Sequence, residues 1–139
     1  MEWLNKMRDA IDYIENNIET ELDPEEIAKV ACCSTFHFQR MFLMLTGVTL
    51  KDYIRKRRLT LAAQEIAVSD TKVIDLALKY GYDSPESFSK AFRRTHGCTP
   101  SAARKPGVKL KAFPRISFQL YLSGKKRIQD YWKGIDSDN

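Results

Sequence analysis

The chain contains two copies of one pattern of residue types, fifty residues apart, and this repeat limits the possible folds more than any other feature. Four identities define it: Phe38 and Phe88, Phe42 and Phe92, Gly47 and Gly97, and Thr49 and Thr99. A repeat of this length indicates one small supersecondary unit that is present twice. The 139 residues are therefore predicted to be organised around two equivalent units.

Each copy is predicted to be a pair of short helices joined by a tight turn. In the downstream copy the first helix stops at Gly81, and Ser84-Pro85 begins the second, because serine caps a helix and proline suits its first turn. In the upstream copy Ser34 is the cap, and Cys32 stands where the downstream copy has Gly81. Two helices joined in this way form a helix-turn-helix.

The predicted fold class is all-α, with seven helices forming two helix-turn-helix subdomains. Thr49 begins a long linker helix that ends near Val68, and Thr71 or Asp70 is expected to cap a helix over 72–80. Thr99-Pro100 begins a last short helix. The expected division is a first subdomain over 1–48, the linker helix over 49–68, a second subdomain over 69–105, and a tail over 106–139.

Charge is distributed unevenly along the chain. Residues 1–30 contain nine acidic and three basic residues, whereas residues 31–139 contain nine acidic and twenty basic residues. The basic body favours an anionic partner, and the first, amphipathic helix is expected to keep its acids in water, away from that partner. These acids are Asp9, Asp12, Glu15 and Glu19. A basic run in the linker helix, at positions 51 and 55–58, is either a solvated face or a set of phosphate contacts.

The second helix of each unit carries outward polar residues of the types that read DNA. Gln, Arg, Lys and Ser hydrogen-bond base edges in a major groove or reach phosphates, and Phe36 suits a thymine methyl. Glu86 either accepts from a cytosine amine or favours the helix N-terminus. The predicted DNA-binding residues are Thr35, Phe36, His37, Gln39, Arg40, Pro85, Glu86, Ser87, Ser89 and Lys90, with possible phosphate contacts at Ser34, Lys51, Arg55, Ser84 and Arg93.

The length of the linker helix suggests that one chain reads two successive grooves. A helix of roughly twenty residues spans about 30 Å, and successive major-groove entries on one face of B-DNA lie about 34 Å apart. DNA bending would supply any remaining difference.

At these residues the chain resembles the DNA-binding domain of the AraC/XylS family of bacterial transcription regulators. The resemblance covers about residues 5–105, and it is strongest over GYDSPESFSKAFRRTHGCTPSAARK. It implies seven helices, two helix-turn-helix units on one long linker, and activation of promoters in contact with RNA polymerase. One departure is Cys32, where the family usually has glycine.

Two other classes of function fit the sequence less well. A helical adaptor that binds an acidic partner without reading bases has no need of duplicated turns followed by polar-faced helices. An enzyme is a distant third, because the two histidines belong to no catalytic set that can be assembled from the sequence. We therefore expect a non-enzyme.

The cysteines and the apolar runs set further expectations. Three cysteines without a CxxC pair predict no metal site and a reducing, cytoplasmic location. No run approaches the roughly 20 apolar residues that span a bilayer, so no membrane is expected. We expect no cofactor and no small-molecule effector on this chain.

After Pro106-Gly107 the sequence changes from helical periodicity to alternation at period two. Leu110 to Ala112 and Ile116 to Leu122 are predicted to form a strand. The segment LKAFPRISFQLYLSG looks like the opening strand of the effector-binding domain that follows the DNA-binding domain in one branch of the same family. Because a lone strand is unstable, we expect a partly disordered tail unless it docks on the body or on a second chain.

Overall fold

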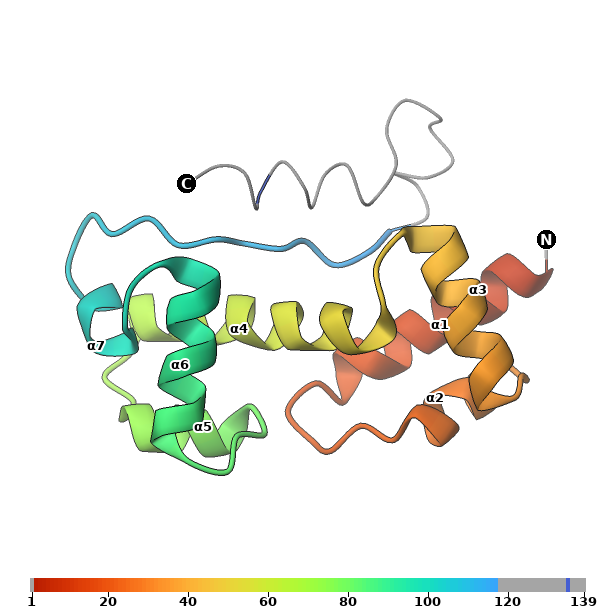
Figure 1. Ribbon diagram of the computed structural model, residues 1–139, viewed down its shortest axis with the longest axis horizontal. Coiled ribbons are helices and arrows are strands. Elements are labelled where there is room, and N and C mark those ends of the chain that lie inside the picture. The colour runs from red at the N-terminus through yellow and green to blue at the C-terminus, as the bar shows by residue number, and fades with distance from the viewer. Residues whose placement is uncertain (1, 118–134, 136–139) are drawn as a thin grey trace.

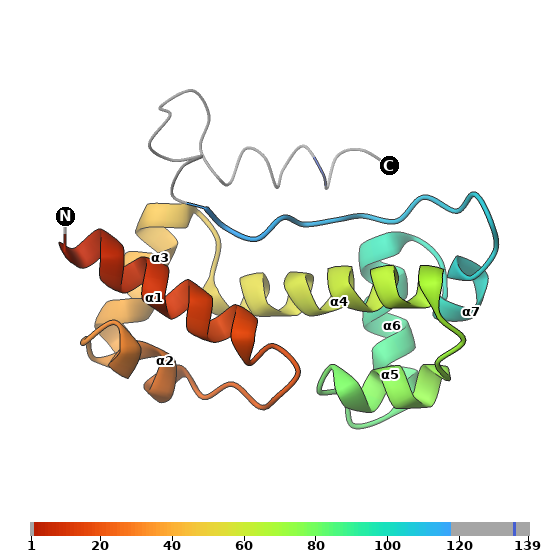
Figure 2. The same ribbon diagram turned by 180° about the vertical axis from the view of Figure 1, so that it is seen from behind.

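Seven α-helices make up the part of the chain that the computed structural model describes, residues 2–117 and 135 (Figure 1). In chain order they are α1 (Glu2–Asn16), α2 (Pro24–Val30), α3 (Thr35–Thr46), α4 (Leu50–Val68), α5 (Val73–Lys79), α6 (Pro85–His96) and α7 (Pro100–Ala103). Helices α1–α3 gather at one end of α4 and α5–α7 at the other, which confirms the all-α fold with two helix-turn-helix units on a linker helix (Figure 2). Within the described residues, no helix is both long enough and apolar enough to cross a membrane.

Each unit has its own hydrophobic core, and α4 contributes to both. In the first core Phe38 and Phe42 are fully buried, with ring centroids 6.0 Å apart, and Tyr53 of α4 packs beside them. In the second core Phe88 and Phe92 hold the equivalent positions, 5.8 Å apart. The four repeated phenylalanines are therefore core residues, as the repeat predicts.

The two helix-turn-helix turns have the same hydrogen bonds although one contains cysteine and the other glycine. The amide of Cys33 donates to Ala28 O at 3.0 Å, and the amide of Tyr82 donates to Ala77 O at 2.8 Å. Cys32 has φ 57° and Gly81 has φ 84°, so both occupy the left-handed region. Cysteine at this position leaves the first turn as tight as the second.

Replacing Cys32 by glycine is expected to raise the free energy of unfolding by about 1 kcal/mol, because a left-handed conformation costs an L-residue roughly 1–2 kcal/mol and glycine little. Cys32 is exposed, so little packing is lost. The control is Cys33→Gly: Cys33 is half-buried against the first core, and its replacement should lower stability. Urea unfolding measures both, and a loss of stability in Cys32→Gly equal to that in Cys33→Gly would contradict the assignment of backbone strain to Cys32.

Helix α5 begins without the side-chain cap predicted at Thr71 or Asp70. Lys72 occupies the N-cap position and makes no capping hydrogen bond. The hydroxyl of Thr71 instead accepts from Ser69 Oγ at 3.1 Å, and Arg104 donates to the carbonyl oxygens of Ser69 and Thr71. Arg104, the residue after α7, thus holds the segment before α5, and the first amides of α5 have no side-chain cap.

Glu15 does not lie in water as predicted, because it forms a buried ion pair with Arg57. Their side chains are 8% and 12% exposed, and Arg57 Nη2 lies 2.9 Å from Glu15 Oε1. Tyr53 donates its hydroxyl to the same carboxylate at 2.7 Å. Burial and the charge of Glu15 both raise the pKa of Tyr53.

Arg58 is a second member of the basic run that has a structural role. Its guanidinium donates to Ile18 O at 2.9 Å and to Thr20 O at 2.7 Å, which ties the segment after α1 to α4. The basic run was interpreted as either a solvated face or a set of phosphate contacts. Arg57 and Arg58 fit neither interpretation, because oxygen atoms of the protein itself bind their guanidinium groups.

Residues 108–117, which we call the strap, lie along α4 without forming a strand (Figure 1). Phe113 and Ile116 are buried in the first core, so this part of the tail docks on the body, which was the stated exception to the predicted partial disorder. No strand forms in the strap because its amides at 111, 113 and 116 donate to side chains of α4 and α6 rather than to another backbone. The remainder of the predicted strand, 118–122, lies outside the described residues.

Candidate nucleic-acid interface

Helices α3 and α6 lie on the same side of the molecule and are built in the same way. Both pass in front of the neighbouring helices α1 and α4 in Figure 1 and behind them in Figure 2. At their N-termini, Ser34 Oγ accepts from the amide of His37 and Ser84 Oγ from the amide of Ser87, each at 3.2 Å. Both end at a left-handed glycine. The two helices therefore occupy equivalent positions in their units.

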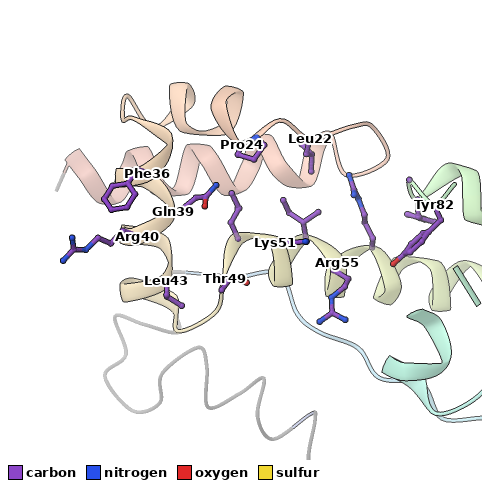
Figure 3. A pocket seen from close by; sticks show the side chains of 15 residues that line it. Leu22, Pro24, Phe36, Gln39, Arg40, Leu43, Thr49, Lys51, Arg55 and Tyr82 are labelled. Carbon is purple, nitrogen blue, oxygen red and sulfur yellow. The ribbon is translucent and has the colours of Figure 1, made fainter. Parts of the chain in front are cut away.

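The outward face of α3 combines polar and apolar side chains. Phe36 is 75% exposed, and Gln39 and Arg40 are exposed beside it. Figure 3 shows Gln39 pointing toward α4 and Arg40 pointing away from it. Leu43 lies one turn further along the same face and is 45% exposed, so a flat aromatic and an aliphatic side chain flank the two polar groups.

The outward face of α6 is more polar. Glu86, Ser87 and Lys90 are exposed, and Ser89 is half-buried. The Ser87 hydroxyl donates to Ser84 O at 3.1 Å, so part of its hydrogen-bonding capacity is used at the helix cap. The negative charge of Glu86 lies in the first turn, where it interacts favourably with the positive end of the helix dipole. Lys90 is thus the long cationic side chain in the middle of this face.

A groove of about 740 Å³ lies between the two units (Figure 3). Its walls come from α3, from the N-terminal half of α4 and from the turn at Tyr80–Tyr82. Among its fifteen lining residues are four cations and no carboxylate; the cations are Arg40, Lys51, Arg55 and Arg58. The groove is therefore electropositive and adjoins the outward face of α3.

The cations around the groove are not equally available to a ligand. Arg58 is held by backbone carbonyls, and Arg55 forms an ion pair with Asp52 while its side chain remains 37% exposed. Lys51 is exposed. Among the residues that the structure describes, none pairs with the side-chain charge of Lys51 or Arg40. These two are the cations best placed to meet an anion.

The sequence-predicted residues divide into two groups in space. Those of the first unit converge, because Phe36, Gln39 and Arg40 border the same groove as Lys51 and Arg55. Those of α6 lie outside the groove, on the outward face of the second unit. Exposed positions are Ser34, Phe36, His37, Gln39, Arg40, Lys51, Glu86, Ser87, Lys90 and Arg93, and half-buried positions are Thr35, Arg55, Ser84, Pro85 and Ser89.

Ten of the fifteen residues that line the groove are absent from the sequence-based set, and Leu43 and Tyr82 are two of them. Leu43 follows Phe36 by seven residues and Arg40 by three, so helical periodicity could have placed it on the same face. Tyr82 packs edge-on against Phe88, with ring centroids 5.4 Å apart, and also reaches the groove. Nothing in the local sequence pattern distinguishes this tyrosine from a core residue.

His96 is buried and holds three segments of the chain together. Its Nε2 donates to Leu59 O of α4 at 3.0 Å, and its Nδ1 accepts from the amide of Lys111 at 3.0 Å. Burial lowers the pKa of this imidazole, in keeping with a neutral ring that has one donor and one acceptor nitrogen. His96 is therefore a structural residue behind the interface.

Known proteins resemble this chain in sequence and in fold. A family model described as a helix-turn-helix domain matches residues 27–106. The regulatory protein SoxS of Escherichia coli is 41% identical over 98 residues, which cover 70% of this chain and 92% of SoxS.

Two solved structures are similar in fold and sequence. One is a transcriptional regulator with an AraC-type DNA-binding domain from Chromobacterium violaceum, with a TM-score of 0.68 and 27% identity over 75% of this chain and 96% of that one. The other is the DNA-binding domain of the global transcriptional factor AdpA in complex with a target DNA, with a TM-score of 0.65 and 28% identity over 70% of this chain and 87% of that one.

Proposed function

Because the chain belongs to the AraC/XylS family of helix-turn-helix transcription regulators, we propose that it regulates transcription by inserting α3 and α6 into adjacent major grooves of double-stranded DNA. The observation that carries the proposal is the placement of two equivalently capped helices on one side of a shared linker. The similarity to a domain that was solved in complex with a target DNA supports DNA binding by this fold.

The outward side chains of α3 and α6 are suited to different bases. On α3, Arg40 is suited to guanine and Gln39 to adenine, with Phe36 against a thymine methyl. On α6, Lys90 is suited to guanine and Glu86 to the amine of cytosine. The two half-sites should therefore differ in sequence, because the two faces differ in chemistry.

The groove between the units is proposed to face the phosphate backbone between the half-sites. Lys51 and Arg55 line it, and the absence of a carboxylate among its lining residues favours an anion there. Ser34, Ser84 and Arg93 are proposed to contact phosphates at the edges of the two major grooves. We also propose that the chain contacts RNA polymerase at the promoters that it activates. A transcription assay with purified polymerase tests this contact.

Arg40→Ala and Lys90→Ala are expected to weaken different halves of one DNA site. Selecting bound sequences from random duplexes should give the wild-type protein a split site with two conserved blocks about one helical turn apart. Each substitution should relax base preference in one block only. It should weaken the binding free energy by about 1–3 kcal/mol, which is roughly 5- to 150-fold in affinity.

The control for these variants is Arg8→Ala, which removes an exposed cation from α1, a helix that carries neither reading face. It should leave both blocks of the selected site unchanged. If Arg40→Ala and Lys90→Ala also leave affinity and base preference unchanged, the assignment of α3 and α6 to the grooves is wrong.

A further inference from the structure

The strap connects the two units along a second path, parallel to α4. Figures 1 and 2 both show this segment running beside α4 from the α7 end toward α1 and α3. It lies beyond residue 106, where the match to the family model ends. The helix-turn-helix pattern itself therefore does not account for it.

At the second unit the strap is held by polar and apolar contacts. The amide of Lys111 donates to His96 Nδ1 at 3.0 Å, and Leu110 packs against the second core. His96 is the last residue of α6, and its other ring nitrogen bonds to Leu59 O of α4. One imidazole thus joins the recognition helix α6, the linker helix and the strap.

At the first unit the strap is anchored by Phe113, which is fully buried in the first core. Its amide donates to Thr60 Oγ1 at 2.9 Å, and its carbonyl oxygen accepts from Arg57 Nη1 at 2.7 Å. The ammonium of Lys56 lies 4.7 Å from the centre of its ring. Three residues from two successive turns of α4 therefore hold one strap residue.

The far end of the strap reaches α1. Ile116 is buried in the first core, and its amide donates to the Tyr53 hydroxyl at 3.3 Å. Arg115 forms an ion pair with Asp12 of α1. Each end of the strap is thus bonded to a different unit, and a displacement of one unit relative to the other must break some of these contacts.

A single helix is a compliant connection, because long helices curve and their hydrogen bonds lengthen easily on one side. We propose that the strap is a positioning element that fixes the orientation of α3 relative to α6 and so sets the half-site spacing that the protein accepts. Phe113 and Thr60 are its principal positioning residues. This inference rests on the proposed DNA-binding function.

Two strap variants test the proposal at one anchor. Phe113→Ala removes the buried ring, and Thr60→Val removes only the acceptor for the Phe113 amide, so it remains informative if Phe113→Ala does not fold. The matched control is Ile27→Ala, which removes a buried side chain from α2 in the first core, away from the strap.

The first measurement needs no DNA. Residual dipolar couplings from α3 and α6 should fit one alignment tensor in the wild type and in Ile27→Ala, and two different tensors in Phe113→Ala and Thr60→Val. A single shared tensor in both strap variants would overturn the proposal.

The second measurement uses the selected split site with one base pair added or removed between the blocks. The altered spacing should lower the affinity of the wild type and of Ile27→Ala about tenfold, the cost of a typical mismatch. It should lower the affinity of the strap variants distinctly less, because their two units can reorient. Equal losses in all four proteins overturn the inference. If no split site is selected at all, the proposed function fails, whereas the dipolar couplings still decide whether the strap orients the units.

Discussion

Replacing Glu15 by alanine is expected to lower the free energy of unfolding by about 3–5 kcal/mol, the usual cost of leaving one partner of a buried ion pair without the other. Arg57 is 12% exposed and makes two side-chain hydrogen bonds to Glu15 Oε1, through Nε and Nη2, and a third to Oε2. Without Glu15 the guanidinium of Arg57 loses these three hydrogen bonds and keeps the one to the Phe113 carbonyl oxygen. Tyr53 loses its acceptor at the same time.

The matched control is Glu19→Ala. Glu19 lies one turn further along the chain, and its side chain is 55% exposed, 3.7 Å from Lys79. An exposed pair of this kind contributes about 0–1 kcal/mol. Urea unfolding followed by circular dichroism measures both variants, and replacing Arg57 by leucine in the Glu15→Ala protein should restore part of the loss. A loss below about 1 kcal/mol in Glu15→Ala would show that Arg57 finds water or another partner.

The repeat was sufficient to predict the helix-turn-helix units because each of its positions has a local physical role. Ser34 and Ser84 cap a helix, and Gly47 and Gly97 end one in the left-handed conformation. Such roles depend on residues a few positions apart, so they can be read from the chain without knowledge of the tertiary structure. The same holds for the exposure of Arg40 and Lys90.

The partners of Arg57 could not be read in this way, because Glu15 is 42 residues distant and belongs to another helix. A helix pattern shows which face a residue occupies, and Arg57 follows the buried Tyr53 by four positions. That spacing places Arg57 on the inner face of α4, but its positive charge led to the prediction that it contacts solvent or phosphate. Only the tertiary structure supplies the carboxylate that makes burial of this charge possible.

His96 and the strap show the same limit. His96 follows Phe88 and Phe92 at four-residue steps and so continues the inner stripe of α6, yet its partners come from α4 and from residue 111. Alternation of apolar and polar residues predicts a strand that buries every other residue, whereas the buried residues of the strap, Phe113 and Ile116, are three positions apart. Here the surface that covers it is a helix, and side-chain oxygen and nitrogen atoms replace the second strand.

A duplex with both half-sites is expected to bind about 10²–10⁴ times more tightly than a duplex with one, because α4 holds the second unit near its groove once the first is bound. The 19 residues of α4 span about 28 Å, less than the roughly 34 Å between successive major grooves. The bound DNA should therefore be bent toward the protein, which circular-permutation mobility or end-to-end fluorescence transfer measures.

Base pairs inserted between the half-sites distinguish binding by two units joined through α4 from binding by two independent units. An added half-turn of about five base pairs rotates the second major groove to the far side of the duplex, where α6 cannot reach it, and the gain should disappear. A full added turn restores the phase but roughly doubles the distance that α4 must span, so the gain should remain lost. If either duplex binds as tightly as the selected site, α3 and α6 do not read adjacent grooves as two units held at a fixed spacing.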